Sequence, residues 1–273
     1  PANRITLAIA IEGVDPATLH PAPNAPVKAY QVGDVRQFWV HNSSTLEVKQ
    51  ITAKLVYLSK HAYFWQDEAT IPFNASAAAA TEADWEAAGQ SFDQTYERVR
   101  AVFGQEESPG LDGDPRLFII NSDALGTEGG HFGQADQLPV EIEPFSNQGQ
   151  YFYMSNSGSA GIASDYYKEV LAHEFQHMIH KNVDPDEEGW FNEGMSMLSQ
   201  QVAGMRGDNW VEKFFLIPDQ SLWYWSSESS DYGQSYLFMD YLYEQMGEEF
   251  IKDLVANQAN GLESVDETLS AYN

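Results

Sequence analysis

The chain contains no cysteine among its 273 residues. Disulfide bonds and thiolate metal sites are therefore both excluded, and any zinc ion must be held by imidazole and carboxylate groups. No apolar run approaches the roughly 20 residues that a membrane-spanning helix needs, so membrane insertion is not expected. No internal repeat is evident.

Basic residues are scarce: 14 Lys and Arg stand against 41 Asp and Glu, which gives a formal net charge of −27. A surface this negative repels phosphate backbones and anionic lipid head groups, so nucleic acids and membrane surfaces are not expected partners. The same charge favours solubility, would suit a halophilic protein, and leaves carboxylates available for hard cations such as Ca²⁺. The hydrophobic fraction of 43% predicts a packed globular protein.

The first part of the chain has the pattern of β-structure. Ile5, Leu7, Ile9 and Ile11 alternate with small or polar residues, which is the two-residue period of a strand. Further strand-like runs cover residues 36–41, 48–58 and 62–65. We therefore expect a small β-rich domain over residues 1–73. Because the chain begins at Pro1 without Met, we also expect it to be a piece of a longer precursor.

The second part, residues 74–273, mixes helices and strands. Thr81 and Asp84 form a capping-box pattern before a run of apolar residues at helical spacing, and Gly104 fits the end of that helix. Short strands are predicted at 117–120, 129–132 and 151–154. Beyond Ser164 the chain is predicted to be mostly helical, with breaks near 184–189 and 218–230. The fold class is α+β.

One motif points to chemistry: His173-Glu174-Phe175-Gln176-His177, of the form H-E-x-x-H. Two histidines four residues apart lie on one face of a helix, so both imidazoles can reach one metal ion. Glu174 can then act as general base toward a water molecule on the metal. Ser164 and Asp165 supply a helix start, and apolar residues supply a buried face. An amphipathic helix with two surface histidines is the structural alternative.

A catalytic zinc site needs a third protein ligand and an open position. Glu193 follows His177 by 16 residues. That separation allows the first helix to end near Asn182, a loop to turn, and a second helix to carry Glu193 back to the metal. Gly194 allows this second helix to approach closely. The alternative is an ordinary helical glutamate.

Other potential ligands follow the motif. His180 lies a helical turn beyond His177, where one straight helix cannot easily direct three ligands to one ion, so we expect a packing or supporting role. The metzincin pattern requires glycine at 180 and histidine at 183, where this chain has His180 and Val183, and is excluded. The acidic loop after the helix is expected to be hydrated or calcium-binding. Its members are Asp184, Asp186, Glu187 and Glu188.

The segments around these residues resemble known metallopeptidases. The stretch W-F-N-E-G at 190–194 is similar to the aminopeptidase N family of gluzincins, although that family's Gly-x-Met-x-Asn motif is absent. Thermolysin-type enzymes have aspartate four residues after the glutamate ligand, where this chain has Met197. The sequence more closely resembles the hyicolysin family of secreted bacterial metallopeptidases. The segments that carry this resemblance are 109–116 (PGLDGDPR), 171–179 (LAHEFQHMI), 190–196 (WFNEGMS), 232–237 (YGQSYL) and the β-rich stretch 30–65.

This resemblance implies a zincin-type catalytic domain and a secreted zinc endopeptidase that hydrolyses peptide or protein substrates. Its implied metal ligands are His173, His177 and Glu193, with Glu174 as general base. Tyr232 resembles a tyrosine of the aminopeptidase N family and is a candidate donor to the oxyanion. His131 and Tyr236 are its rivals. By analogy with zincins, 129–132 and 151–154 are expected to form an edge strand and its neighbour.

Two other functions stay open. The chain could be a non-catalytic extracellular binding module with a structural or vestigial metal site, or a hydrolase of a non-peptide amide or epoxide. Zn²⁺ is the expected cofactor. Ca²⁺ is a further candidate at Asp112 and Asp114 or in the 184–188 loop, although neither has the twelve-residue EF-hand pattern.

Overall fold

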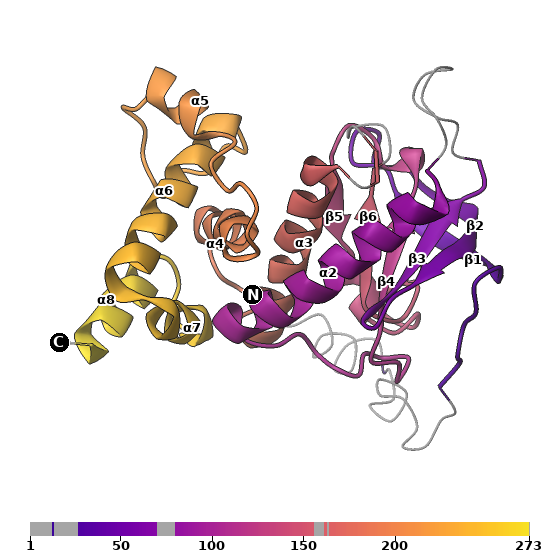
Figure 1. Cartoon of the computed structure of the whole chain (residues 1–273). Helices are drawn as coiled ribbons and strands as arrows, with labels where there is room; N and C mark the ends of the chain where they lie inside the picture. Colours follow the sequence, from indigo (N-terminus) through magenta and orange to yellow (C-terminus); the bar gives the residue numbers. More distant parts are fainter. Residues whose placement is uncertain (1–12, 14–26, 70–79, 156–160, 163, 273) are drawn as a thin grey trace. The chain divides into compact units, whose positions relative to one another are not determined.

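The computed structural model describes residues 13, 27–69, 80–155, 161–162 and 164–272 (Figure 1). The chain divides into two compact units, one of Pro1–Asp93 with Glu107–Leu171 and one of Gln94–Glu106 with Ala172–Asn273. Two helices, α2 (Glu82–Phe103) and α3 (Asp165–Val183), contribute residues to both units. The strand predicted at Ile5–Ile11 lies outside the described residues.

The first unit is built on a six-stranded sheet in the order β1-β2-β3-β4-β6-β5. Strands β1, β2 and β3 are antiparallel to one another, β3, β4 and β6 are parallel, and β5 returns antiparallel to β6. The predicted edge strand near residue 130 and its neighbour are thus confirmed as β5 and β6. The strands are β1 (Val35–His41), β2 (Val48–Leu58), β3 (Ala62–Asp67), β4 (Leu117–Asn121), β5 (Gly130–Phe132) and β6 (Tyr151–Met154).

The central strands are buried on both faces. All five residues of β4 are buried, as expected for a parallel strand inside a sheet. On one face Phe64 of β3 packs against Trp85 and Phe92 of α2, whose N-terminal half covers this face (Figure 1). On the other face Trp65 packs with Phe38 in an aromatic cluster. Side-chain alternation along each strand therefore separates the two halves of this core.

The domain boundary expected between residues 73 and 74 lies outside the described residues. Described strands from both sides of it pair directly, because β3 runs parallel to β4 with Phe64 opposite Ile119. The sheet therefore joins the predicted N-terminal β-region to strands that follow the boundary. The capping box predicted at the start of α2 is confirmed, since Thr81 and Asp84 exchange side-chain and backbone hydrogen bonds.

The second unit is helical. It contains the C-terminal parts of α2 and α3, followed by five further helices. Tyr96 of α2 stacks on Phe175 of α3 with ring centroids 5.0 Å apart, and Arg98 of α2 pairs with Glu248. The predicted helical C-terminal half is confirmed. The five helices are α4 (Gly189–Val202), α5 (Val211–Leu216), α6 (Ser229–Met246), α7 (Glu248–Ala256) and α8 (Leu262–Ala271).

Helices α4 and α6 make a close contact at Gly194 (Figure 1). A Cβ atom at Gly194 would lie 2.9 Å from the carbonyl oxygen of Ser235 and 2.9 Å from Cγ of Met239. The absence of a side chain at Gly194 therefore lets the backbones of α4 and α6 approach. The sequence predicted a close approach of this helix at the metal, and the close contact at Gly194 is instead with α6. No helix among the described residues is both long and apolar enough to span a membrane.

Candidate metal centre

The two histidines of the H-E-x-x-H motif face one another on α3. Nε2 of His173 lies 3.0 Å from Nε2 of His177, and the two rings meet edge to face with centroids 4.7 Å apart. The helix is held in place by its buried face, where Phe175 and Met178 are fully buried. The four-residue spacing therefore brings two imidazole nitrogens to one point, as predicted.

Glu193 reaches the same point from α4. Its Oε2 atom lies 3.0 Å from Nε2 of His173 and 3.5 Å from Nε2 of His177. Five residues, 184–188, separate the two helices, so the chain reverses direction between its second and third ligating groups. The three side chains are 12%, 15% and 22% exposed in the order His173, His177 and Glu193, so the centre is reachable from solvent.

This donor set fits a zinc ion. Two imidazole nitrogens and one carboxylate oxygen are the protein ligands of several catalytic zinc sites, which leave a fourth position open. Among the described residues, the ligand atoms that converge here come from His173, His177 and Glu193 alone. The structure therefore brings together the three residues that the sequence predicted as metal ligands.

Further residues of α4 orient the imidazoles. Asn192 presents Oδ1 to Nδ1 of His177, and Oγ of Ser196 lies 2.9 Å from the same nitrogen. Because an amide oxygen only accepts, His177 donates from Nδ1, which leaves the lone pair of Nε2 free for a metal. Neither residue belongs to the H-E-x-x-H motif, although Ser196 is three residues after Glu193 on the same helix face.

Gln200 contacts the imidazole of His173. Its Nε2 atom lies 3.3 Å from Nδ1 of His173, while its buried Oε1 atom has no hydrogen-bond partner among the described residues. In this orientation the amide NH₂ faces Nδ1, and only a half-turn of the amide group would place Oε1 where it could accept from Nδ1–H. Gln200 is seven residues after Glu193, again on the face of α4 that meets the histidines.

The electrostatics of the three groups are strongly coupled. Burial lowers the pKa of His177, but the charge and hydrogen bond of Glu193 outweigh this effect and raise it to about 9. Burial raises the pKa of Glu193, yet His177 and His173 hold it well below its usual range. The carboxylate is therefore ionised and attracts positive charge, which a proton supplies in the metal-free protein.

Glu174 lies beside this centre but is not one of the converging groups. It is 6% exposed and follows His173 on α3. Its negative charge is among the causes that raise the pKa of His177, which requires the two side chains to be near one another.

The other predicted catalytic residue, Tyr232, lies in the first turn of α6. Its ring packs edge-on against Trp225, with centroids 4.9 Å apart, and Trp225 in turn covers Gly189 at the start of α4. Its rival Tyr236 donates its hydroxyl hydrogen to Oε1 of Gln201, so that hydroxyl is already engaged. His131 belongs to the first unit, where Nδ1 lies 2.5 Å from Oε1 of Glu128.

The acidic loop between α3 and α4 is only partly solvated. Asp186 and Glu188 are exposed, as expected for a hydrated loop, but Asp184 is 2% exposed and Glu187 is half-buried. His180, predicted to pack or to support, is fully buried. The loop therefore carries buried groups as well as a hydrated acidic edge.

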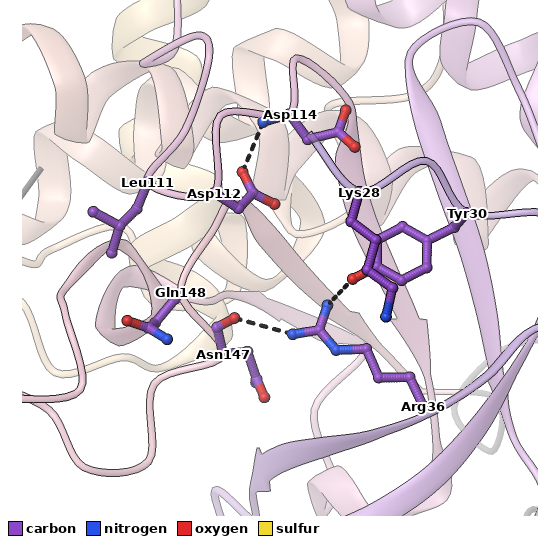
Figure 2. A pocket seen from close by; sticks show the side chains of 8 residues that line it. All are labelled: Lys28, Tyr30, Arg36, Leu111, Asp112, Asp114, Asn147 and Gln148. Atoms are coloured by element: carbon purple, nitrogen blue, oxygen red, sulfur yellow. Dashed lines mark hydrogen bonds between the residues drawn. The ribbon is translucent and has the colours of Figure 1, made fainter. Parts of the chain in front are cut away.

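The proposed calcium site at Asp112 and Asp114 gains no support. Both residues line a cavity of about 240 Å³ in the first unit, but Lys28 and Arg36 line it too (Figure 2). Oδ1 of Asp112 accepts a hydrogen bond from the backbone N–H of Asp114, and Oδ2 of Asp114 accepts one from Tyr63. Two cationic side chains beside these carboxylates do not resemble the all-oxygen shell of calcium.

The chain is similar in sequence to a known metalloprotease. No protein-family model matches the chain. It is 27% identical over 270 residues to the neutral metalloprotease ShpI of Staphylococcus hyicus, a match that covers 89% of this chain and 59% of ShpI. The match bears out the expected resemblance to a bacterial metallopeptidase.

The solved structures that match this chain are less similar to it in sequence. An M1 zinc metallopeptidase from Deinococcus radiodurans is 12% identical with a TM-score of 0.48, and a mutant form of it has a TM-score of 0.47. Each match covers 88% of this chain and 59% of the solved chain. The chain thus spans about 59% of the length of ShpI and of each solved relative. Over most of its own length, this chain is similar in sequence to a bacterial neutral metalloprotease.

Proposed function

We propose that this chain is a zinc-dependent peptidase that cleaves within peptide or protein substrates. The observation that carries the proposal is the convergence of Nε2 of His173, Nε2 of His177 and Oε2 of Glu193 within 3.5 Å of one another. The similarity to a neutral metalloprotease supports the same chemistry. These three residues are the proposed zinc ligands.

The number of ligands favours catalysis over a purely structural role. Structural zinc sites are closed by four protein ligands, whereas catalytic sites keep a position for water or substrate. The described residues supply three ligand atoms at this centre, and all three side chains are partly exposed. The non-catalytic binding module is therefore the less favoured alternative.

Glu174 is the proposed general base. When bound, zinc lowers the pKa of a coordinated water molecule and polarises the carbonyl group of the substrate. Glu174 accepts the proton of the attacking water and transfers it to the nitrogen of the leaving amine. Asn192 and Gln200 hold the two imidazoles in orientation during these steps. Tyr232 is the proposed donor to the oxyanion, on the basis of its place one turn before Ser235, where α6 meets Gly194.

The proposal includes a secreted enzyme, which rests on the resemblance to the hyicolysin family. The net charge of −27 suits a soluble enzyme that works away from nucleic acids and anionic lipids. Detection of the protein in the culture medium of its host would test this part separately from the chemistry.

The decisive experiment compares wild type with Glu174→Gln. This substitution keeps the size of the side chain and its neighbours but removes the base. We expect peptide cleavage, followed with a peptide library and mass spectrometry, to fall by about 10²–10⁴-fold. Zinc content, measured by mass spectrometry of the metal, should be unchanged because Glu174 is not a ligand.

Glu263→Gln is the matched control, because Glu263 is exposed on α8 and the same charge is removed there. This control should cleave at the wild-type rate. Wild-type protein that binds zinc yet cleaves no peptide in the library would overturn the proposed activity and favour a binding module. Cleavage of a non-peptide amide alone would favour the other hydrolase function.

A further inference from the structure

A second group of potential ligands lies just beyond the first on the chain. His180 is in the last turn of α3, and Asp184 and Glu187 are in the loop that leads to α4. One ligand atom from each of these residues lies within 4.8 Å of the others. None of the three belongs to the centre formed by His173, His177 and Glu193.

The groups of this second cluster are buried with few hydrogen-bond partners. Among the described residues, Nε2 of His180 and Oε2 of Glu187 make no hydrogen bond, and the carboxylate of Asp184 has Asp186 beside it as a polar neighbour. His180 is fully buried and Asp184 is 2% exposed. A buried carboxylate with no donor or cation is costly, by several kcal/mol on general grounds, and is rarely left so in a folded protein. A cation at this point would therefore stabilise the two carboxylates.

His180 does not supply a positive charge to this cluster at neutral pH. Burial is the main cause that lowers the pKa of His180, to about 3, so its ring is neutral at neutral pH. Burial also raises the pKa of Glu187 to about 7 and raises that of Asp184. A neutral imidazole is the form that binds a divalent cation, and cation binding would displace the proton that Glu187 partly keeps near pH 7.

Residues of the loop between α7 and α8 donate hydrogen bonds to the segment that carries the cluster. Oε1 of Glu187 accepts a hydrogen bond of 2.8 Å from the backbone N–H of Gly261. Asn260 donates to the carbonyl oxygen of Asp186 at 2.6 Å, and Gln258 donates to that of Val183 at 2.8 Å. The loop between α7 and α8 therefore holds the acidic loop by hydrogen bonds, while Oε2 of Glu187 stays buried without a hydrogen bond.

The chemistry of the donors selects the class of cation. Calcium takes six to eight oxygen ligands, whereas imidazole nitrogen suits zinc and other divalent transition metals. We infer that His180, Asp184 and Glu187 form a second, structural site for a divalent transition metal of the zinc class, which fastens the turn between α3 and α4. This site is independent of the proposed peptidase activity.

Gln176 permits His180 to act as a ligand. Its Nε2 atom lies 3.4 Å from Nδ1 of His180, and its Oε1 atom accepts a hydrogen bond of 2.5 Å from Oγ of Ser196. An amide can present either its oxygen or its NH₂ to the ring. With the oxygen facing His180, Nδ1 donates and Nε2 is free to bind a cation.

The test counts metal ions in protein dialysed against Zn²⁺, Mn²⁺ or Ca²⁺ in turn. We expect wild type to retain two equivalents of Zn²⁺. His173→Ala with His177→Ala should retain one, Asp184→Asn should retain one, and the combination should retain none. Asp266→Asn, an exposed change of equal charge on α8, should retain two.

A thermal melt keeps the test informative if one variant is poorly folded. Zn²⁺ should raise the Tm of His173→Ala/His177→Ala and should not raise the Tm once Asp184→Asn is added. Without metal, Asp184→Asn should melt above wild type, since it removes a buried unpaired charge.

One equivalent of Zn²⁺ in wild type that Asp184→Asn leaves unchanged would overturn the second site. Retention of Ca²⁺ without Zn²⁺ at the second cluster would overturn the assigned metal class. Loss of peptidase activity would affect neither result, because the count in His173→Ala/His177→Ala does not depend on catalysis.

Discussion

Asn192 and His177 are joined by a contact between Oδ1 of the amide and Nδ1 of the ring. Asn192 precedes Glu193 on α4, so the helix that brings the carboxylate to the centre also orients the imidazole that faces it. One helix therefore supplies both the carboxylate and the contact to the imidazole. Loss of either residue should affect metal binding, but to different extents.

Replacement of Glu193 by Gln should weaken zinc binding severely. The substitution removes the charged oxygen that lies 3.0 Å from His173 and 3.5 Å from His177. We expect the zinc affinity, measured by competition with a chelator, to fall by more than the roughly 10–100-fold that loss of a supporting hydrogen bond costs. Glu212→Gln, an exposed change on α5, is the control. Unchanged affinity in Glu193→Gln would remove Glu193 from the ligand set.

Replacement of Asn192 by Ala should weaken zinc binding by about 10–100-fold, because His177 loses the acceptor that fixes its ring and tautomer. The same chelator competition measures it. Asn192→Asp keeps an acceptor oxygen at this position and should retain near-normal affinity. If the two variants lose affinity equally, the contact with Nδ1 is not what matters.

Replacement of Tyr232 by Phe should lower kcat by about 10²–10³-fold if its hydroxyl stabilises the oxyanion. Zinc content should not change, since Tyr232 is not part of the ligand cluster. Tyr236→Phe provides the comparison, because that hydroxyl donates to Gln201 and its loss should affect stability more than kcat. A Tyr232→Phe enzyme with normal kcat would assign the oxyanion donor elsewhere.

Stability of the metal-free protein should fall as the pH rises above neutrality. The pKa of His177 is raised from 6.5 to about 9 in the folded state, so its contribution is complete below pH 6.5 and is lost as the pH rises through 9. The pKa of Glu193 is lowered, so its contribution is present above its unfolded value and is lost only in acid. The raised pKa of His177 corresponds to about 3 kcal/mol at most.

Urea unfolding of chelator-treated protein between pH 5.5 and 9 measures this dependence. In Glu193→Gln the decline between pH 6.5 and 9 should be much smaller, because the charge that raises the pKa of His177 is gone. An equally steep decline in both proteins would show that other groups cause it.

Replacement of Gly194 by Ala should destabilise the second unit by about 1–3 kcal/mol. The new Cβ would lie 2.9 Å from the backbone oxygen of Ser235, so α4 and α6 would have to separate. Thermal or urea unfolding measures the change. Glu263→Ala, at an exposed helical position, should change stability little. A neutral effect of Gly194→Ala would mean that the two helices adjust freely.

Sequence patterns were sufficient to predict where individual helices and strands lie along the chain. Residues 48–58 were predicted as a strand and form β2, and the helix that carries His173 was expected to end near Asn182 and ends at Val183. Such patterns depend on hydrophobic period and capping within one segment, which the sequence contains directly. The separation of Glu193 from His177 suited a helix–loop–helix return, which made Glu193 a candidate ligand but did not decide its position.

Those sequence patterns did not predict which distant segments contact one another. The pairing of β3 with β4 joins residues 62–66 to 117–121, and nothing in either strand specifies its partner. The burial of Asp184 was not expected either, because an acidic loop is normally solvated. Its burial depends on hydrogen bonds from Asn260 and Gly261 to neighbouring loop positions, far along the chain.

The amino-acid sequence by itself determined that two imidazoles share one helix face, since a spacing of four residues has that consequence in any α-helix. It also determined that cysteine takes no part in a metal site. Only the tertiary structure decided that Glu193 meets those imidazoles, that Asn192 and Gln200 orient them, and that His180 lies with Asp184 and Glu187 in a buried cluster. Each of these relationships depends on how separate segments pack, and packing is a property of the whole folded chain.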